Sequence, residues 1–295
     1  MYRLFLILVF ATALPHIGNA QRKRAFIVGI SNYRNNGYKV WNNIHGAEDV
    51  QLLTPELQKK GFKVQSLINE AATYKGIATA LNGFITASKK GDIVYIHFSC
   101  HGQPVEDGLK GDEIDESDHW DEAIVPIDAG KEYNANGYKG EKHLIDDELN
   151  KYLTILRKKI GPSGRLFVAI DACHAGTISR NGIETTRGTN EGLTKKEGNK
   201  YNPPTNNVKH YTIKKAPDMA PVLFLEACQS RERNSEIIIK GKEYGSLSYN
   251  IWQALKIMPS FDKKDMETFK VFVKASTEIK GRWPRTQTLV IESSL

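Results

Sequence analysis

Apolar runs of strand length alternate along the chain with segments of helical spacing. The runs lie at residues 24–31, 62–68, 92–99, 165–171 and 221–228. Between and after them, apolar residues recur at the three- and four-residue spacing of a helix, at 45–53, 76–88, 146–156, 245–258 and 266–279. Continuous apolar runs are typical of parallel strands covered on both faces. The pattern predicts an α/β fold, a three-layer αβα sandwich with a mainly parallel sheet.

Two positions refine the expected helices. Pro55 interrupts the helical pattern that begins at His45, so we expect this helix to kink or restart there. Asp146 precedes an apolar stripe that starts at Leu149, and we expect its side chain to cap the N-terminus of that helix.

Two of the predicted strands end in reactive side chains. Cys173 follows the run 165–171, and His101 follows the run 92–99. Open α/β sheets carry their sites at the carboxyl ends of such strands, and the ends of neighbouring strands lie about 5 to 10 Å apart. Because a histidine at that separation can activate a thiol, the two strand ends predict a Cys–His catalytic pair.

The same residues also have plainer interpretations. A single cysteine in a buried strand is usually a core residue, and only the second reactive strand end favours catalysis for Cys173. We interpret His174 as structural and Cys228 as a core residue. Zinc binding by Cys100–His101 together with Cys173–His174 is a further hypothesis, but adjacent pairs lack the usual spacing of zinc ligands.

Composition limits the classes of function that fit. The 295 residues, 40% hydrophobic and 25% charged, suffice for one α/β core in a single domain over residues 21–295. The 41 basic side chains are scattered among 34 acids, so the net charge of +7 predicts no nucleic-acid binding. No segment after residue 20 is apolar for long enough to span a membrane.

Residues 1–20 have the pattern of a secretory signal peptide. Arg3 gives a positive start, residues 4–14 an apolar centre, and small residues a cleavage site after Ala20. The apolar run is about half of the roughly 20 residues that a spanning helix needs, so export is favoured over anchoring. We expect the mature chain to be secreted or periplasmic, with three cysteines that do not form a disulfide framework.

Residues 180–216 form a long hydrophilic stretch between two predicted strands. They contain Gly, Asn, Thr and Lys with Pro203–Pro204 and almost no apolar side chains. This composition predicts a mobile loop rather than a packed element.

Two motifs resemble a known family. Phe98–Gly102 (FSCHG) and Asp171–Gly176 (DACHAG) are similar to the His and Cys motifs of the metacaspases and related caspase-fold cysteine peptidases, and point to a bacterial-type, secreted member. The similarity covers most of residues 24–291. The chain departs from the family at Cys100, where glycine is usual, and at Ala172 and Ala175, where serines are usual.

The resemblance implies a cysteine endopeptidase with a caspase-like fold. Cys173 would attack a peptide carbonyl, and His101 would activate the thiol and then protonate the leaving amine. Backbone N–H groups of Gly102 and Cys173 would hold the oxyanion.

The resemblance also implies a preference at S1, the pocket for the residue before the cut. Asp49 and Asp171 match the two acids that line this pocket in metacaspases, with Ser99 beside them. Paired carboxylates favour Arg or Lys over Asp in a substrate. The plainer interpretations are a charge early in a helix for Asp49 and a hydrogen-bonded strand end for Asp171.

The family further implies a calcium site. Asp118, Asp146 and Asp147 match three calcium ligands of calcium-dependent metacaspases, and clustered carboxylates suit this cation. At the position of the fourth expected acid this chain has Arg180, whose positive charge opposes calcium binding. We therefore expect no required cofactor and keep calcium as a hypothesis.

We expect the enzyme, as a monomer, to cut its own chain within residues 180–216, because exposed loops are common sites of cleavage. This loop offers eight basic side chains at which the cut could occur: Arg180, Arg187, Lys195, Lys196, Lys200, Lys209, Lys214 and Lys215.

Two alternative functions remain open. One is a catalytically silent binding module, and the other is a peptidase switched by a Cys100–Cys173 disulfide.

Overall fold

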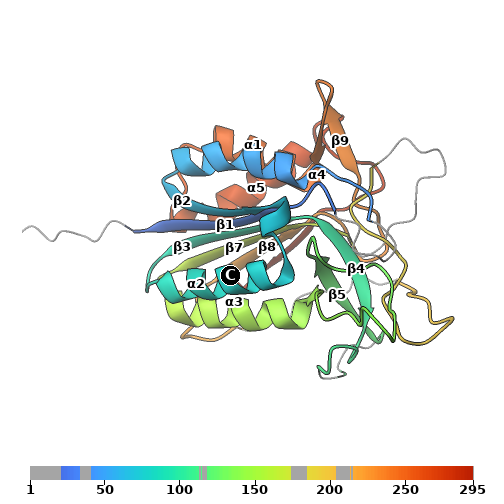
Figure 1. Cartoon of the computed structure of the whole chain (residues 1–295). Coiled ribbons are helices and arrows are strands. Elements are labelled where there is room, and N and C mark those ends of the chain that lie inside the picture. The colour runs from blue at the N-terminus through green and yellow to red at the C-terminus, as the bar shows by residue number, and fades with distance from the viewer. Residues whose placement is uncertain are drawn as a thin grey trace, which may run out of the picture.

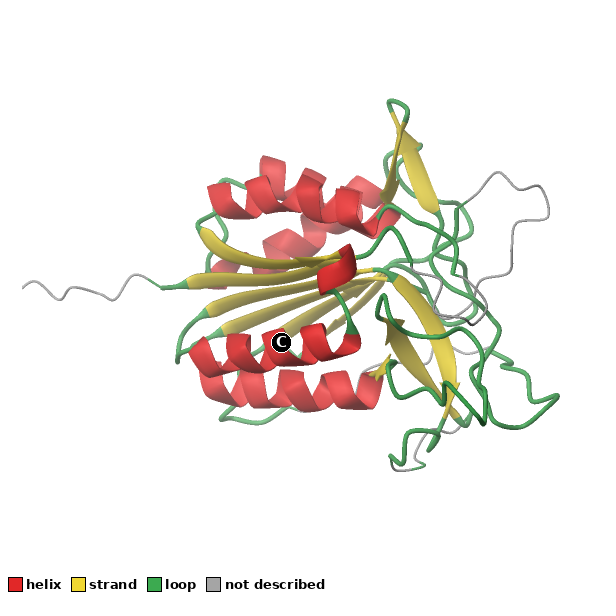
Figure 2. Cartoon of the chain, viewed as in Figure 1, coloured by secondary structure: helices red, strands yellow, loops and turns green. Residues whose placement is uncertain are grey.

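A six-stranded sheet lies between two layers of helices (Figures 1 and 2). This arrangement confirms the predicted α/β sandwich with a mainly parallel sheet. The computed structural model describes residues 21–33, 41–112, 114, 118–173, 185–203, 213 and 215–294. The predicted signal peptide, residues 1–20, lies outside the described residues.

The strand order of the sheet is β11-β8-β7-β3-β1-β2. All neighbours are parallel except β11, which is antiparallel to β8. Ser99 at the end of β3 pairs with Asp171 at the end of β7, so the two predicted reactive strand ends are adjacent. The strands are β1 (Lys23–Gly29), β2 (Phe62–Ile68), β3 (Ile93–Ser99), β7 (Arg165–Asp171), β8 (Val222–Glu226) and β11 (Val290–Ser293).

Alternate side chains of the buried strands pack into two hydrophobic cores. Ala25 and Ile27 of β1 pack with the layer of α1 (Gly46–Lys59), α4 (Ser246–Ile257) and α5 (Met266–Thr277). Phe26 and Val28 pack on the opposite face with α2 (Tyr74–Ala87) and α3 (Asp146–Ile160). Figure 1 shows the two helical layers on opposite sides of the sheet.

Short strands lie beyond the carboxyl end of the sheet, where the sequence pattern predicted none. β4 (His101–Glu106), β5 (Trp120–Val125) and β6 (Leu144–Ile145) form an antiparallel sheet. β9 (Glu236–Ile239) and β10 (Lys242–Gly245) form a hairpin that projects beside α4 (Figure 1).

Two local predictions for the helices are wrong. α1 does not restart at Pro55 but continues through it to Lys59. Pro55 is exposed, so water can replace the one backbone hydrogen bond that proline cannot donate. Ile145, not Asp146, is the N-cap of α3, and Asp146 is the first helical residue.

Part of the loop that was expected to be unpacked is packed in the structure. Arg187 and Leu193 are fully buried there, and Tyr201 nearly so. Residues 180–184, 204–212 and 214 of this loop lie outside the described residues. Within the described ranges, no helix has the length and apolarity needed to cross a membrane.

Candidate active site

The close approach of α1 to the sheet brings Asp49 to the ends of β3 and β7. Gly29 at the end of β1 and Gly46 at the start of α1 permit it, because a Cβ on Gly29 would lie 2.8 Å from the Gly46 carbonyl carbon. Ser99 Oγ then donates to Asp49 Oδ2 at 2.7 Å. The predicted trio Asp49, Ser99 and Asp171 is thus gathered and fully buried.

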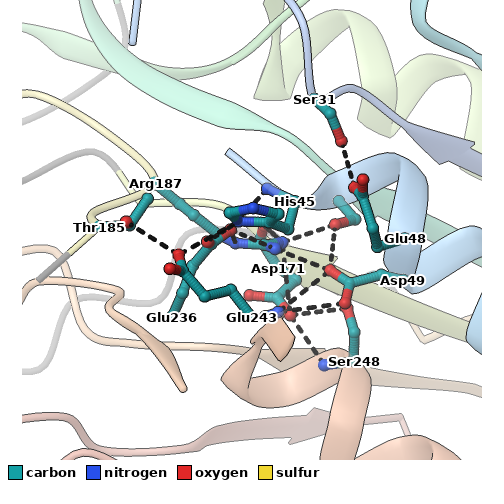
Figure 3. A network of polar contacts seen from close by, with 12 residues as sticks. Ser31, His45, Glu48, Asp49, Asp171, Thr185, Arg187, Glu236, Glu243 and Ser248 are labelled. Atoms are coloured by element: carbon teal, nitrogen blue, oxygen red, sulfur yellow. Dashed lines mark hydrogen bonds and ion pairs between the residues drawn. The ribbon is translucent and has the colours of Figure 1, made fainter. Parts of the chain in front are cut away.

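The guanidinium of Arg187 fills the space between these three residues (Figure 3). It donates to Asp49 Oδ2 at 2.8 Å and to Ser99 Oγ at 2.5 Å, and lies 3.7 Å from Asp171 Oδ2. Figure 3 shows the acids converging on it from α1, β7 and β9. A basic side chain of the chain itself therefore occupies the acidic pocket.

Glu236 is a third acid in this pocket, and it was not among the residues predicted from the sequence. Its Oε1 accepts from Arg187 Nε at 3.0 Å and from Nη2 at 2.7 Å. Its Oε2 lies 2.6 Å from His45 Nδ1, so His45 fixes the carboxylate. The only sequence signal was an acid at the start of the apolar run Glu236–Ile239.

The charges in the pocket shift one another's protonation. Burial raises the pKa of Asp49 to about 7, although Arg187 opposes this. Burial also disfavours ionisation of Asp171, but Arg187, Asn234 and Ser248 lower the pKa of Asp171 below its usual value. The pocket is therefore anionic around Arg187 at neutral pH.

The backbone of Arg187 is held as firmly as its side chain. Its carbonyl oxygen accepts from the N–H of Cys173 at 2.9 Å and from the N–H of Gly102 at 3.2 Å. Its own N–H donates to the Asn234 carbonyl at 2.9 Å, and Glu236 N–H donates to the Thr185 carbonyl at 2.9 Å. Residues 185–187 thus form a short antiparallel pairing with residues 234–236.

His101 is buried in an aromatic cage. Its ring stacks on Trp41, with ring centroids 4.9 Å apart, and also packs against Tyr33, with centroids 4.8 Å apart. Nε2 donates to the Asn42 carbonyl at 2.8 Å, because a carbonyl can only accept. Burial lowers the pKa of His101 to about 4, so the ring is neutral and Nδ1 is its proton acceptor. Among the described residues, Nδ1 has no hydrogen-bond partner.

The thiol of Cys173 has an unexpected neighbour. Cys228 Sγ lies 3.1 Å from Cys173 Sγ, and Cys173 Sγ lies 2.8 Å from the Glu232 carbonyl oxygen. The hydrogen bond from Cys228 to Cys173, together with burial, raises the pKa of Cys228. Cys228 is thus more than the core residue predicted from the sequence.

Cys100 has a different environment from Cys173. It belongs to the core on the α2 and α3 side of the sheet, whereas Cys173 and Cys228 cluster with Trp120 and Tyr201. Burial raises the pKa of Cys100 to about 12. All three cysteines are free thiols in this structure.

A group of three close carboxylates exists, but its members are not the predicted calcium ligands. Asp107, Asp112 and Asp121 each offer an oxygen within 4.8 Å of the others, whereas Asp118, Asp146 and Asp147 form no such group among the described residues. Burial, followed by the charges of Asp112 and Asp107, raises the pKa of Asp121 to about 9. The expected opposing residue Arg180, like His174, lies outside the described residues.

A second group of potential ligands borders the pocket. His45, Glu236 and Glu243 approach one another, but the ion pairs from His45 to both carboxylates already account for this cluster.

Comparison with known proteins identifies the family. Residues 23–180, more than half of the chain, match the model of the metacaspase, peptidase C14 domain. Metacaspase-2 of Arabidopsis thaliana is 32% identical over 165 residues, which are 53% of this chain and 35% of the relative. Metacaspase-1 of Eremothecium gossypii is 27% identical over 164 residues, 52% of this chain and 32% of the relative. The matched region thus spans about a third of the length of these relatives.

A solved structure supports the fold. The crystal structure of protein GSU0716 from Geobacter sulfurreducens superposes with a TM-score of 0.61 at 20% identity, covering 92% of this chain and 93% of the other. Together with the family match, the sandwich and the thiol and imidazole at adjacent strand ends lead to one conclusion: the chain belongs to the metacaspases, a family of caspase-like cysteine peptidases.

Proposed function

We propose that the protein is a cysteine endopeptidase that cuts after Arg or Lys, and that it first cuts its own chain between Arg187 and Gly188. The observation that carries this proposal is the Arg187 carbonyl oxygen, which accepts from the backbone N–H groups of both Gly102 and Cys173. A carbonyl polarised by two such donors is ready for attack by an adjacent thiolate.

The chemistry follows from these contacts. The thiol of Cys173 gives its proton to His101 Nδ1, and the sulfur adds to the Arg187 carbonyl carbon. The N–H groups of Gly102 and Cys173 hold the negative oxygen. As the C–N bond breaks, His101 returns the proton to the nitrogen of Gly188. Water then hydrolyses the thioester, which restores the thiol and leaves a carboxylate on Arg187.

His101 is arranged for this role. Its Nε2–H is committed to the Asn42 carbonyl, which leaves the unprotonated Nδ1 to accept a proton. The N–H of His101 donates to Tyr33 Oη at 2.9 Å, and Tyr33 in turn donates to the Val125 carbonyl at 3.0 Å. These bonds fix the ring against the end of β3.

The acidic pocket supports specificity for basic residues. Asp49, Asp171 and Glu236 surround the guanidinium, and an Asp side chain in the same place would add a fourth buried negative charge.

Hydrolysis of internally quenched fluorogenic peptides with Arg, Lys or Asp at the cut, each followed by Gly-Thr as in the chain itself, tests the proposed specificity. We expect cleavage after Arg and Lys, none after Asp, and loss of at least about a thousandfold in Cys173→Ala. Cys100→Ala is the matched control and should retain activity. A preference for Asp, or full activity of Cys173→Ala, contradicts the proposal. A silent binding module would leave all three peptides uncut.

We also propose that a divalent cation such as calcium binds at Asp107, Asp112 and Asp121 rather than at the trio predicted from the sequence. Three carboxylates so close together repel one another unless a proton or a cation intervenes. Carboxylate oxygens are the ligands that calcium prefers. The charge of Asp147 also acts on Asp121, so one predicted ligand borders the group.

The structure favours Cys228, rather than Cys100, as the partner of Cys173 in a disulfide that switches the peptidase, because the sulfur of Cys228 lies 3.1 Å from that of Cys173. With a peroxide as oxidant, the Cys173 thiolate would attack one peroxide oxygen and become a sulfenic acid, releasing hydroxide. The Cys228 thiol would then attack that sulfur, forming the disulfide and releasing water. We propose this Cys173–Cys228 disulfide as a reversible block of the nucleophile.

A further inference from the structure

Gly188, the residue directly after Arg187, lies against the main chain of Cys173. A Cβ built on Gly188 would overlap the carbonyl oxygen of Cys173 and lie 2.7 Å from its carbonyl carbon and 3.1 Å from its Cβ. All three atoms belong to the nucleophile itself. Only glycine fits at this position without a shift.

The main chain of Cys173, which contacts Gly188, has little freedom to move. The N–H of Cys173 is committed to the Arg187 carbonyl at 2.9 Å. The residues just before Cys173 are also held by hydrogen bonds. The Asp171 carbonyl accepts from Cys100 N–H at 3.4 Å, and the Ile170 carbonyl accepts from Ala227 N–H at 3.1 Å. Moving the Cys173 main chain would therefore displace the thiol and one of the two donors to the Arg187 carbonyl.

The segment after the bond is also held in place. Residues 188–193 run parallel to β4, with bridges from Gly102 to Gly188 and from Val105 to Leu193. Leu193 N–H donates to the Pro104 carbonyl and Glu106 N–H to the Leu193 carbonyl, each at 2.8 Å. A chain bound along β4 in this way cannot swing its first residue away from Cys173.

We propose that the enzyme selects substrates in which glycine directly follows the basic residue. This inference rests on the proposed cut after Arg187 and adds a requirement that the acidic pocket does not impose. The chain's own loop fits it. Among the eight basic residues of 180–216, only Arg187 is followed by glycine.

A panel of matched peptides tests the requirement. The peptides carry Thr-Thr-Arg-X-Thr-Asn with X as Gly, Ala or Val. We expect the Gly peptide to be cut about ten to a hundred times faster than the Ala peptide, and the Val peptide more slowly still. Equal rates for Gly and Ala overturn the inference. In that case the proposed cut after Arg stands; if no peptide is cut, both proposals fail.

Self-cleavage provides a second test in the full chain. Gly188→Ala should slow cleavage between residues 187 and 188 by about tenfold or more, whereas Asn190→Ala, an exposed residue of the same segment, should not. Thermal melting at the wild-type temperature verifies that both variants are folded. Self-cleavage of Gly188→Ala at the wild-type rate overturns the inference, and the peptide panel decides the matter if that variant does not fold.

Discussion

The guanidinium of Arg187 is fully buried, and removing a charge from water is costly unless partners replace the solvent. Asp49, Asp171 and Glu236 supply those partners and outnumber the single positive charge. When Arg187 leaves, the three acids repel one another and favour another basic side chain in its place. The same contacts that hold the loop therefore select the substrate.

The identity of residue 187 should set the rate of self-cleavage. Arg187→Lys should slow it about tenfold, because lysine lacks the Nε–H that reaches Glu236 and the second nitrogen that reaches Asp49. Arg187→Ala should abolish cleavage at this bond, because the buried carboxylates lose their cation. Gel densitometry over time measures both rates, with Lys196→Ala as the exposed control. Cleavage of Arg187→Ala at this bond at the wild-type rate contradicts the role of the pocket.

Peroxide should inactivate the enzyme reversibly through Cys228. In the wild type, mass spectrometry should find a peptide pair linked by Cys173–Cys228, and a thiol reductant should restore activity. Cys228→Ser should form no such link and should lose its activity irreversibly, because the sulfenic acid oxidises further. If reductant restores activity in Cys228→Ser but not in Cys100→Ser, the disulfide partner of Cys173 is Cys100, and this proposal is wrong.

At the scale of elements, the small antiparallel sheet does most to complete the site. β4 starts at His101, presents Gly102 N–H to the Arg187 carbonyl and pairs with residues 188–193. The sequence did not reveal this strand, because Gln103, Pro104 and Glu106 break any apolar alternation. β5 was hidden in the same way, because Asp121 and Glu122 interrupt its apolar residues.

Calcium should stabilise the end of the molecule formed by β4 and β5. We expect calcium to raise the melting temperature of the wild type and to accelerate self-cleavage, with EGTA reversing both effects. Asp121→Asn should remove the calcium-dependent shift, because Asp121 is the most buried ligand of the group. Asp118→Asn is the matched control and should keep it. If the calcium-dependent shift in melting temperature is lost in Asp118→Asn but kept in Asp121→Asn, calcium binds at the residues predicted from the sequence instead.

At the scale of the whole molecule, the sandwich and the adjacency of the two strand ends could be predicted, because buried strands and amphipathic helices leave clear periodic patterns. The gathering of Asp49, Ser99 and Asp171 followed from their match to family motifs. Glu236 and the packed loop 185–203 could not be predicted. The loop is held by backbone pairing and by one buried arginine, and neither leaves a signal in composition.

Sequencing the N-termini that appear when the purified full chain is incubated tests self-cleavage after Arg187 most directly. The wild type should yield a new fragment that begins Gly188-Thr189-Asn190, and Cys173→Ala should stay intact. Cys100→Ala should be processed like the wild type. A wild-type chain that stays intact while cutting Arg peptides, a cut at another bond of the loop, or equal processing of Cys173→Ala would contradict cleavage by Cys173 at the Arg187–Gly188 bond.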